Sequence, residues 1–146
     1  MSSRSREAAT LRAIVRGSSR FGANHHIDAV ADELTEFINC NRIQPARRRR
    51  LLQFLHTSRA LETALMSVCQ ERGLPPSPKP SMKAYLNQLT NCVPPALPQA
   101  LKDHCVTRVA DVRNRLAHGA GAYPAGDLQL NSGFDAARAC LALLLA

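Results

Sequence analysis

Apolar residues recur every three or four positions along most of the chain, which is the spacing that one face of an α-helix requires. The stretch from Ile27 to Ile38 is the clearest, because acidic side chains occupy its opposite face. A longer stretch follows Pro45, a residue suited to the first turn of a helix. It ends where Gly73 and Pro75 interrupt the pattern. No alternating apolar and polar pattern is long enough for a β-strand, so the sequence predicts an all-α protein.

Capping and breaking residues divide this pattern into five or six helices. Asn24 is the expected N-cap of the second helix, and the fifth is expected to bend near Asp103. The proline-rich segment 73–80 is interpreted as a connector inside one domain, because neither half of the chain has enough helices for its own core. Residues 1–146 are therefore expected to form a single helical bundle. The expected helices span about residues 5–16, 25–38, 45–72, 81–89, 98–118 and 133–146, with a loop at 122–132.

Composition and charge indicate which residues build the core and which kind of partner the surface attracts. Hydrophobic residues make up 45% of the 146 positions, whereas aromatic residues make up 4% and Trp is absent, so Leu, Ala, Val and Ile must build the core. The formal net charge is +8 and is spread over both halves of the chain. A basic surface attracts nucleic acids and acidic partners.

The compartment is inferred from the cysteines and the N-terminus. Five cysteines occur without CxxC spacing, and no apolar run follows Met1, so we expect a cytoplasmic protein without a disulfide framework. The longest apolar run, residues 139–146, is too short to span a bilayer, and no membrane partner is expected. His25-His26 and His104-Cys105 lack further ligands at metal-site spacing, so neither a metal nor another cofactor is expected.

The most informative segment closes the fifth predicted helix, where Arg113 and Asn114 are followed by His118 and Gly119. This segment resembles the HEPN superfamily, whose signature is an Arg, a polar residue that is often Asn, and a His four to six residues after the Arg. HEPN domains are compact helical bundles of about this size, so the resemblance covers most of the chain. Steps of about 100° per residue place Asn114 and His118 on one helix face, about 40° apart, but separate Arg113 from His118 by about 140°.

The resemblance implies a metal-independent endoribonuclease, of the kind found in toxin–antitoxin and antiviral-defence systems. The resemblance also implies a homodimer in which two motif helices face each other, which would bring two Arg113 and two His118 side chains into one cleft. By this resemblance His118 acts as the general acid or base, Arg113 grips the phosphate, and Asn114 orients His118 or a phosphate oxygen. The expected products carry a 2′,3′-cyclic phosphate and a 5′-hydroxyl. The expected partners are RNA, a second copy of the chain, and a cognate antitoxin or defence protein.

Other residues are assigned to RNA binding. Four arginines begin the long helix, where cations oppose the helix dipole; phosphate binding is one reason for such a run, and a solvated basic face is the alternative. Tyr123 follows the motif and is placed to stack on a base, unless it is an ordinary half-buried loop residue. Some HEPN toxins have a modifiable Tyr two residues after the His, but Ala120 occupies that position here, which puts that form of control in doubt. The predicted RNA-binding set is Arg47, Arg48, Arg49, Arg50, Arg115 and Tyr123.

Two other functions remain open on the sequence. A HEPN fold can serve as a non-catalytic adaptor that binds RNA or a protein partner. The chain can also be a helical interaction module with no RNA role, in which Arg113 and His118 simply cap carbonyl groups at the end of a helix.

Overall fold

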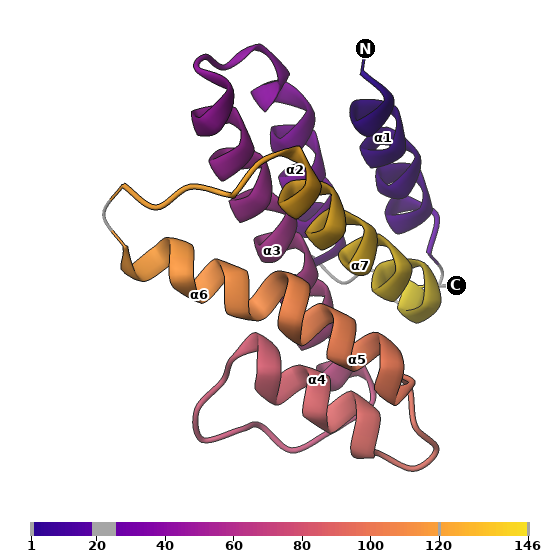
Figure 1. The fold of residues 1–146 in the computed structure, drawn as a ribbon. Helices are drawn as coiled ribbons and strands as arrows, with labels where there is room; N and C mark the ends of the chain where they lie inside the picture. The colour runs from indigo at the N-terminus through magenta and orange to yellow at the C-terminus, as the bar shows by residue number, and fades with distance from the viewer. Residues whose placement is uncertain (1, 19–25, 120, 146) are drawn as a thin grey trace.

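The computed structural model describes residues 2–18, 26–119 and 121–145, and this part of the chain is helical with no β-strand (Figure 1). The predicted all-α class is confirmed. Because α5, a π-helical turn and α6 continue without a break, the described residues form six helical rods, as expected. The elements are α1 (Ser3–Arg16), α2 (His26–Asn39), η1 (a 3₁₀ turn, Cys40–Arg42), α3 (Ala46–Glu71), α4 (Met82–Asn91), α5 (Gln99–Cys105), η2 (the π turn, Val106–Ala110), α6 (Asp111–His118) and α7 (Asp127–Leu145).

The helix ends follow the capping residues of the sequence. Ser2 and Ser81 begin α1 and α4, where each side-chain oxygen accepts a hydrogen bond from a backbone N–H of the first turn. Gly17 ends α1, and Pro45 immediately precedes α3 in an extended conformation. The predicted N-cap of the second helix, Asn24, lies outside the described residues.

The long helix α3 is the spine of the bundle. Its 26 residues correspond to about 39 Å at 1.5 Å per residue, and it packs against α2, α4, α6 and α7. The main core follows its apolar face through Leu61, Leu65 and Val68, which are fully buried as the sequence pattern predicted. Among the described helices, none is both long and apolar enough to cross a membrane.

A second, smaller core joins the first half of α3 to α6. Phe54 of α3 and Leu116 of α6 are buried in it together with Phe37 and Phe134, whose ring centroids are 5.0 Å apart. The partly buried Val112, one turn before Leu116, packs against the same cluster. This core fixes the helix that carries the predicted motif against the start of the spine.

The last helix begins earlier than predicted. The sequence indicated a loop through residue 132 and a helix start at Gly133, but α7 begins at Asp127 and Gly133 lies inside it. A Cβ on Gly133 would lie 2.7 Å from Cε2 of Phe54 and 3.0 Å from the carbonyl oxygen of Arg108. This glycine therefore permits close packing of α7 against its neighbours and does not mark a helix end.

The rod from Gln99 to His118 confirms the predicted fifth helix but not the position of its irregularity. We expected a kink near Asp103, whereas the π turn η2 lies a few residues later. There the N–H of Asp111 donates to the carbonyl of Val106, five residues earlier. Such turns occur frequently at functional sites. Here the π turn leads directly into α6, the motif helix.

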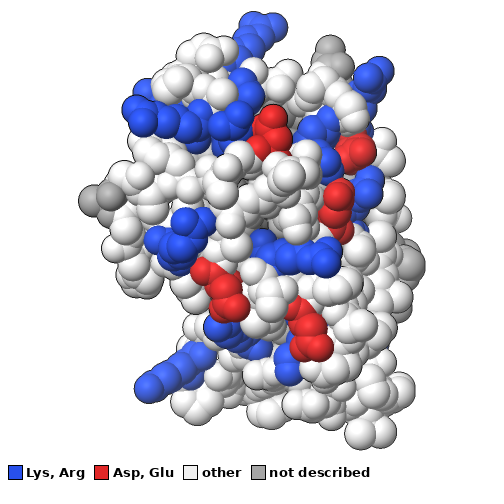
Figure 2. All heavy atoms as spheres, in the orientation of Figure 1, with Lys and Arg blue, Asp and Glu red and all other residues white. Residues whose placement is uncertain are grey.

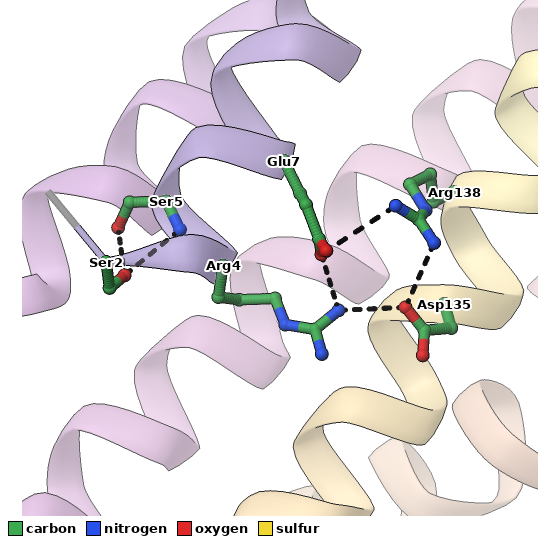
Figure 3. A network of polar contacts seen from close by, with 6 residues as sticks. All are labelled: Ser2, Arg4, Ser5, Glu7, Asp135 and Arg138. Carbon is green, nitrogen blue, oxygen red and sulfur yellow. Dashed lines mark hydrogen bonds and ion pairs between the residues drawn. The ribbon is translucent and has the colours of Figure 1, made fainter.

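A polar cluster fastens α1 to α7 (Figure 3). Nη1 of Arg4 lies 2.8 Å from carboxylate oxygens of both Glu7 and Asp135, and Arg138 approaches the same two carboxylates. The guanidinium carbon of Arg4 also lies 5.1 Å from the ring centroid of Phe134. This arginine therefore links the N-terminal helix to the smaller core.

Candidate functional site

The three motif residues lie on α6, and none of them belongs to the buried face of this helix. Val112 and Leu116 occupy the packed face of this helix, whereas Asn114 and His118 are exposed and Arg113 is partly buried. In the described part of the chain, none of these three motif side chains forms a hydrogen bond or an ion pair. Their polar groups are therefore available to a ligand or a partner.

One copy of the chain does not bring the three motif residues to a single point. Arg113 and Asn114 line a small cavity between α6 and the start of α4, whereas His118 is not among the residues that line it. This agrees with the helical geometry, which separates Arg113 from His118 by about 140° around the axis. The side chains of Arg113 and His118 thus present two different surfaces of α6.

Lys83 adds a cation that the sequence motif did not reveal. It comes from the first turn of α4, lines the same cavity as Arg113, and its Nζ lies 2.6 Å from Oδ1 of Asp111. No local sequence signal links Lys83 to the motif, because the packing of α4 against the α5–α6 rod brings the two together.

The arginine run and Tyr123 do meet in space. Figure 2 shows Lys and Arg side chains gathered over the upper left of the molecule, where α3 begins in Figure 1. The guanidinium carbon of Arg47 lies 5.0 Å from the ring centroid of the half-buried Tyr123. The loop that follows the motif is thereby held against the start of α3. The ring that was predicted to stack on an RNA base therefore already has a guanidinium group against it.

Two of the predicted RNA-binding arginines also have structural partners. Nε of Arg50 lies 2.8 Å from Oδ1 of Asp127 in the first turn of α7, and this hydrogen bond, with the charges of Arg50 and Arg49, lowers the pKa of that carboxyl. Nη2 of Arg115 donates to Oε1 of Gln129 at 2.9 Å. Both arginines fix the start of α7, whereas Arg47 and Arg48 remain exposed at the surface.

Four of the five cysteines are buried, which keeps their thiols away from a substrate at the surface. Cys69 and Cys140 are buried in the main core. Burial raises the pKa of Cys69 to about 11. The hydrogen bond between the thiols of Cys140 and Cys105, together with burial, raises the pKa of Cys140, and the same hydrogen bond lowers the pKa of the fully buried Cys105. A thiol with a raised pKa stays protonated near neutral pH, and the thiolate is the reactive form. Within residues 2–18, 26–119 and 121–145, no three His, Cys, Asp or Glu side chains form a group suited to a metal ion.

Comparison with known proteins gives no relative. No family model, curated protein or solved structure matches this chain.

Proposed function

We propose that this protein is a metal-independent endoribonuclease of the HEPN type. The observation that supports the proposal is that Arg113, Asn114 and His118 lie off the buried face of α6 and have no hydrogen-bond or ion-pair partner among the described residues. If Arg113 and His118 merely capped the helix, they would donate to its last carbonyl groups. No such hydrogen bond occurs in the described residues, which favours a role toward an external ligand.

The side chains present suit RNA cleavage by the neighbouring ribose hydroxyl. His118 exchanges a proton near neutral pH. In the proposed reaction an imidazole accepts the proton of the 2′-hydroxyl while its oxygen attacks the phosphorus, and the bond to the 5′ oxygen breaks. The leaving oxygen takes a proton from an imidazolium, so the products are a 2′,3′-cyclic phosphate and a 5′-hydroxyl. Arg113 neutralises the charge that develops on the phosphate oxygens.

The proposal includes a second copy of the chain. Because Arg113 and His118 lie on different surfaces of α6, one copy alone does not direct both at a single phosphate. Pairing of two α6 helices places Arg113 of one copy opposite His118 of the other. The exposed arginines at the start of α3 then attract the rest of the RNA strand, since Lys and Arg bind phosphates independently of sequence.

The test is cleavage of total RNA in EDTA by the wild type and by the Arg113→Ala and His118→Ala variants. Loss of a general acid or base typically costs 10²- to 10⁴-fold in rate, so we expect both variants to lose about a hundredfold or more. Arg108→Ala and His104→Ala are matched controls, because both residues are exposed on the same helical rod outside the motif.

The controls are expected to cleave as the wild type does. The His104, Arg108 and His118 variants should fold normally, since exposed positions rarely change stability by more than about 0.5 kcal/mol. Circular dichroism checks the fold of the variant at the partly buried Arg113. Equal cleavage by wild type and His118→Ala would overturn the proposal. RNA that is bound by the wild type and left uncut would instead favour the adaptor function.

A further inference from the structure

A small cavity between the start of α4 and the motif helix carries a second inference. Its volume is about 90 Å³, and Lys83, Arg113, Asn114 and Ser81 line it with polar groups. The buried side chains of Met82 and Ala110 complete its lining. A water molecule occupies about 30 Å³, so the cavity accommodates one small polar group and is too small for a nucleobase.

The polar side chains among the lining residues are mainly hydrogen-bond donors. Lys83 and Arg113 carry positive charge and can only donate, and the Asn114 amide supplies two further N–H groups. Oγ of Ser81 already accepts a hydrogen bond from the N–H of Ala84, which leaves its own proton free to donate. Such a set suits an anion with several acceptor oxygens, which is the character of a phosphodiester.

Lys83 already pairs with one carboxylate, that of Asp111. Oδ1 of Asp111 lies 2.6 Å from Nζ of Lys83, and both side chains are about half exposed, at 49% and 47%. An exposed pair of this kind is worth little to stability. The side chain of Lys83 thus lies beside the cavity that Arg113 also lines, and its ammonium group can exchange the exposed carboxylate for a phosphate.

We infer that Lys83 is a second phosphate-binding residue, which holds together with Arg113 one backbone phosphate of a single-stranded RNA. This inference rests on the proposed function, because it names RNA as the source of the phosphate. It assigns to α4 a role that the motif on α6 does not contain. Ser81 and Asn114 add hydrogen bonds to the same phosphate.

The test measures binding separately from cleavage. A fluorescein-labelled single-stranded oligoribonucleotide is titrated with the His118→Ala protein, and anisotropy gives the affinity at several salt concentrations. Adding Lys83→Gln is expected to weaken binding about five- to tenfold and to make the salt dependence shallower by about 0.7, the value for one phosphate contact to a single strand. Lys79→Gln is the matched control, because Lys79 is exposed just before α4 and does not line the cavity.

Asp111→Asn distinguishes phosphate binding from a structural role of the ion pair. If Lys83 binds phosphate, this variant retains or increases RNA affinity, because it removes the competing carboxylate. If Lys83 only supports the fold through Asp111, then Asp111→Asn and Lys83→Gln weaken binding alike, and the inference is wrong. Inorganic phosphate is the second probe, added as a competitor of the bound RNA. If phosphate displaces the RNA only at concentrations far above that of the RNA, the site is specific for RNA. Equal affinities for phosphate and RNA would overturn the inference.

The inference and the proposed function fail in different ways. A wild-type protein that does not cut RNA, but whose RNA affinity depends on Lys83, refutes the nuclease and retains the phosphate site. A protein that cuts RNA, with Lys83→Gln and Lys79→Gln indistinguishable in affinity and salt dependence, retains the nuclease and refutes the site. A protein that does not bind the oligoribonucleotide refutes the site as well.

Discussion

Replacement of Gly133 by alanine tests the packing that places the motif helix. Gly133 lies inside α7, where alanine is intrinsically favoured over glycine by about 1 kcal/mol. Burial of one extra methyl group adds about 0.8 kcal/mol in open space. On helix propensity and burial alone, Gly133→Ala would therefore stabilise the protein.

The structure predicts instead that Gly133→Ala destabilises the protein. The new Cβ would lie 2.7 Å from Cε2 of Phe54 and 3.0 Å from the carbonyl oxygen of Arg108, both well inside the about 3.5–4.0 Å optimum for non-bonded carbon contacts. Phe54 is fully buried and Arg108 contributes backbone, so neither neighbour yields easily. Overpacking typically costs about 1–3 kcal/mol. With two fixed neighbours we expect the upper part of that range, and a net loss of about 1 kcal/mol.

Urea unfolding followed by circular dichroism measures this difference, and the melting temperature is expected to fall by roughly 3 °C for a chain of this size. A double-mutant cycle with Phe54→Leu is the control, because a smaller side chain at that position relieves the clash. The two substitutions should then show favourable coupling. A Gly133→Ala protein that is more stable than the wild type would refute the close approach of α7 to Phe54 and the π turn.

Two further predictions concern charged contacts. Arg4→Ala should destabilise the protein by about 1–2 kcal/mol in urea unfolding, because Arg4 pairs with both Glu7 and Asp135 and stacks on Phe134. The control is Arg6→Ala, which changes an exposed residue and should alter stability by less than about 0.5 kcal/mol. Equal losses of stability in the two variants would contradict the role of the cluster. Arg50 lowers the pKa of Asp127 in the folded protein. The ionised carboxylate therefore stabilises the fold at pH values above about 3.9, the pKa of an Asp in the unfolded chain, and this stabilisation is lost as the pH falls through the lower pKa of the folded protein. The stability of Asp127→Asn should therefore depend less on pH below about pH 4 than that of the wild type. High salt should reduce this difference, because Asp127 is exposed. Acid unfolding curves of the wild type and Asp127→Asn that coincide at low salt would contradict the prediction.

The sequence predicted the helices well because their signals are local. The apolar spacing of α3, the serine before α4 and Gly119 after His118 depend only on neighbouring residues. Gly133 was misinterpreted because the reason for it is a contact with Phe54, from a distant part of the chain. A glycine that permits close packing and a glycine at the boundary of a helix look the same in a sequence.

The candidate site shows the same division between local and long-range information. Arg113, Asn114 and His118 are recognisable because they are close together in sequence on one helix. Lys83 precedes Arg113 by thirty positions, and only the packing of α4 against the α5–α6 rod brings it to the cavity. The partner of Arg50 was hidden for the same reason, since Asp127 lies on another helix.

The most direct test of the proposed nuclease is the chemistry of the cut ends. A defined RNA is incubated in EDTA with the wild type, His104→Ala and His118→Ala, and the termini of the fragments are determined by mass spectrometry. We expect 2′,3′-cyclic phosphate and 5′-hydroxyl ends from the wild type and His104→Ala, and no fragments above background from His118→Ala. Fragments with 3′-hydroxyl and 5′-phosphate ends, or undiminished cleavage by His118→Ala, would contradict this prediction.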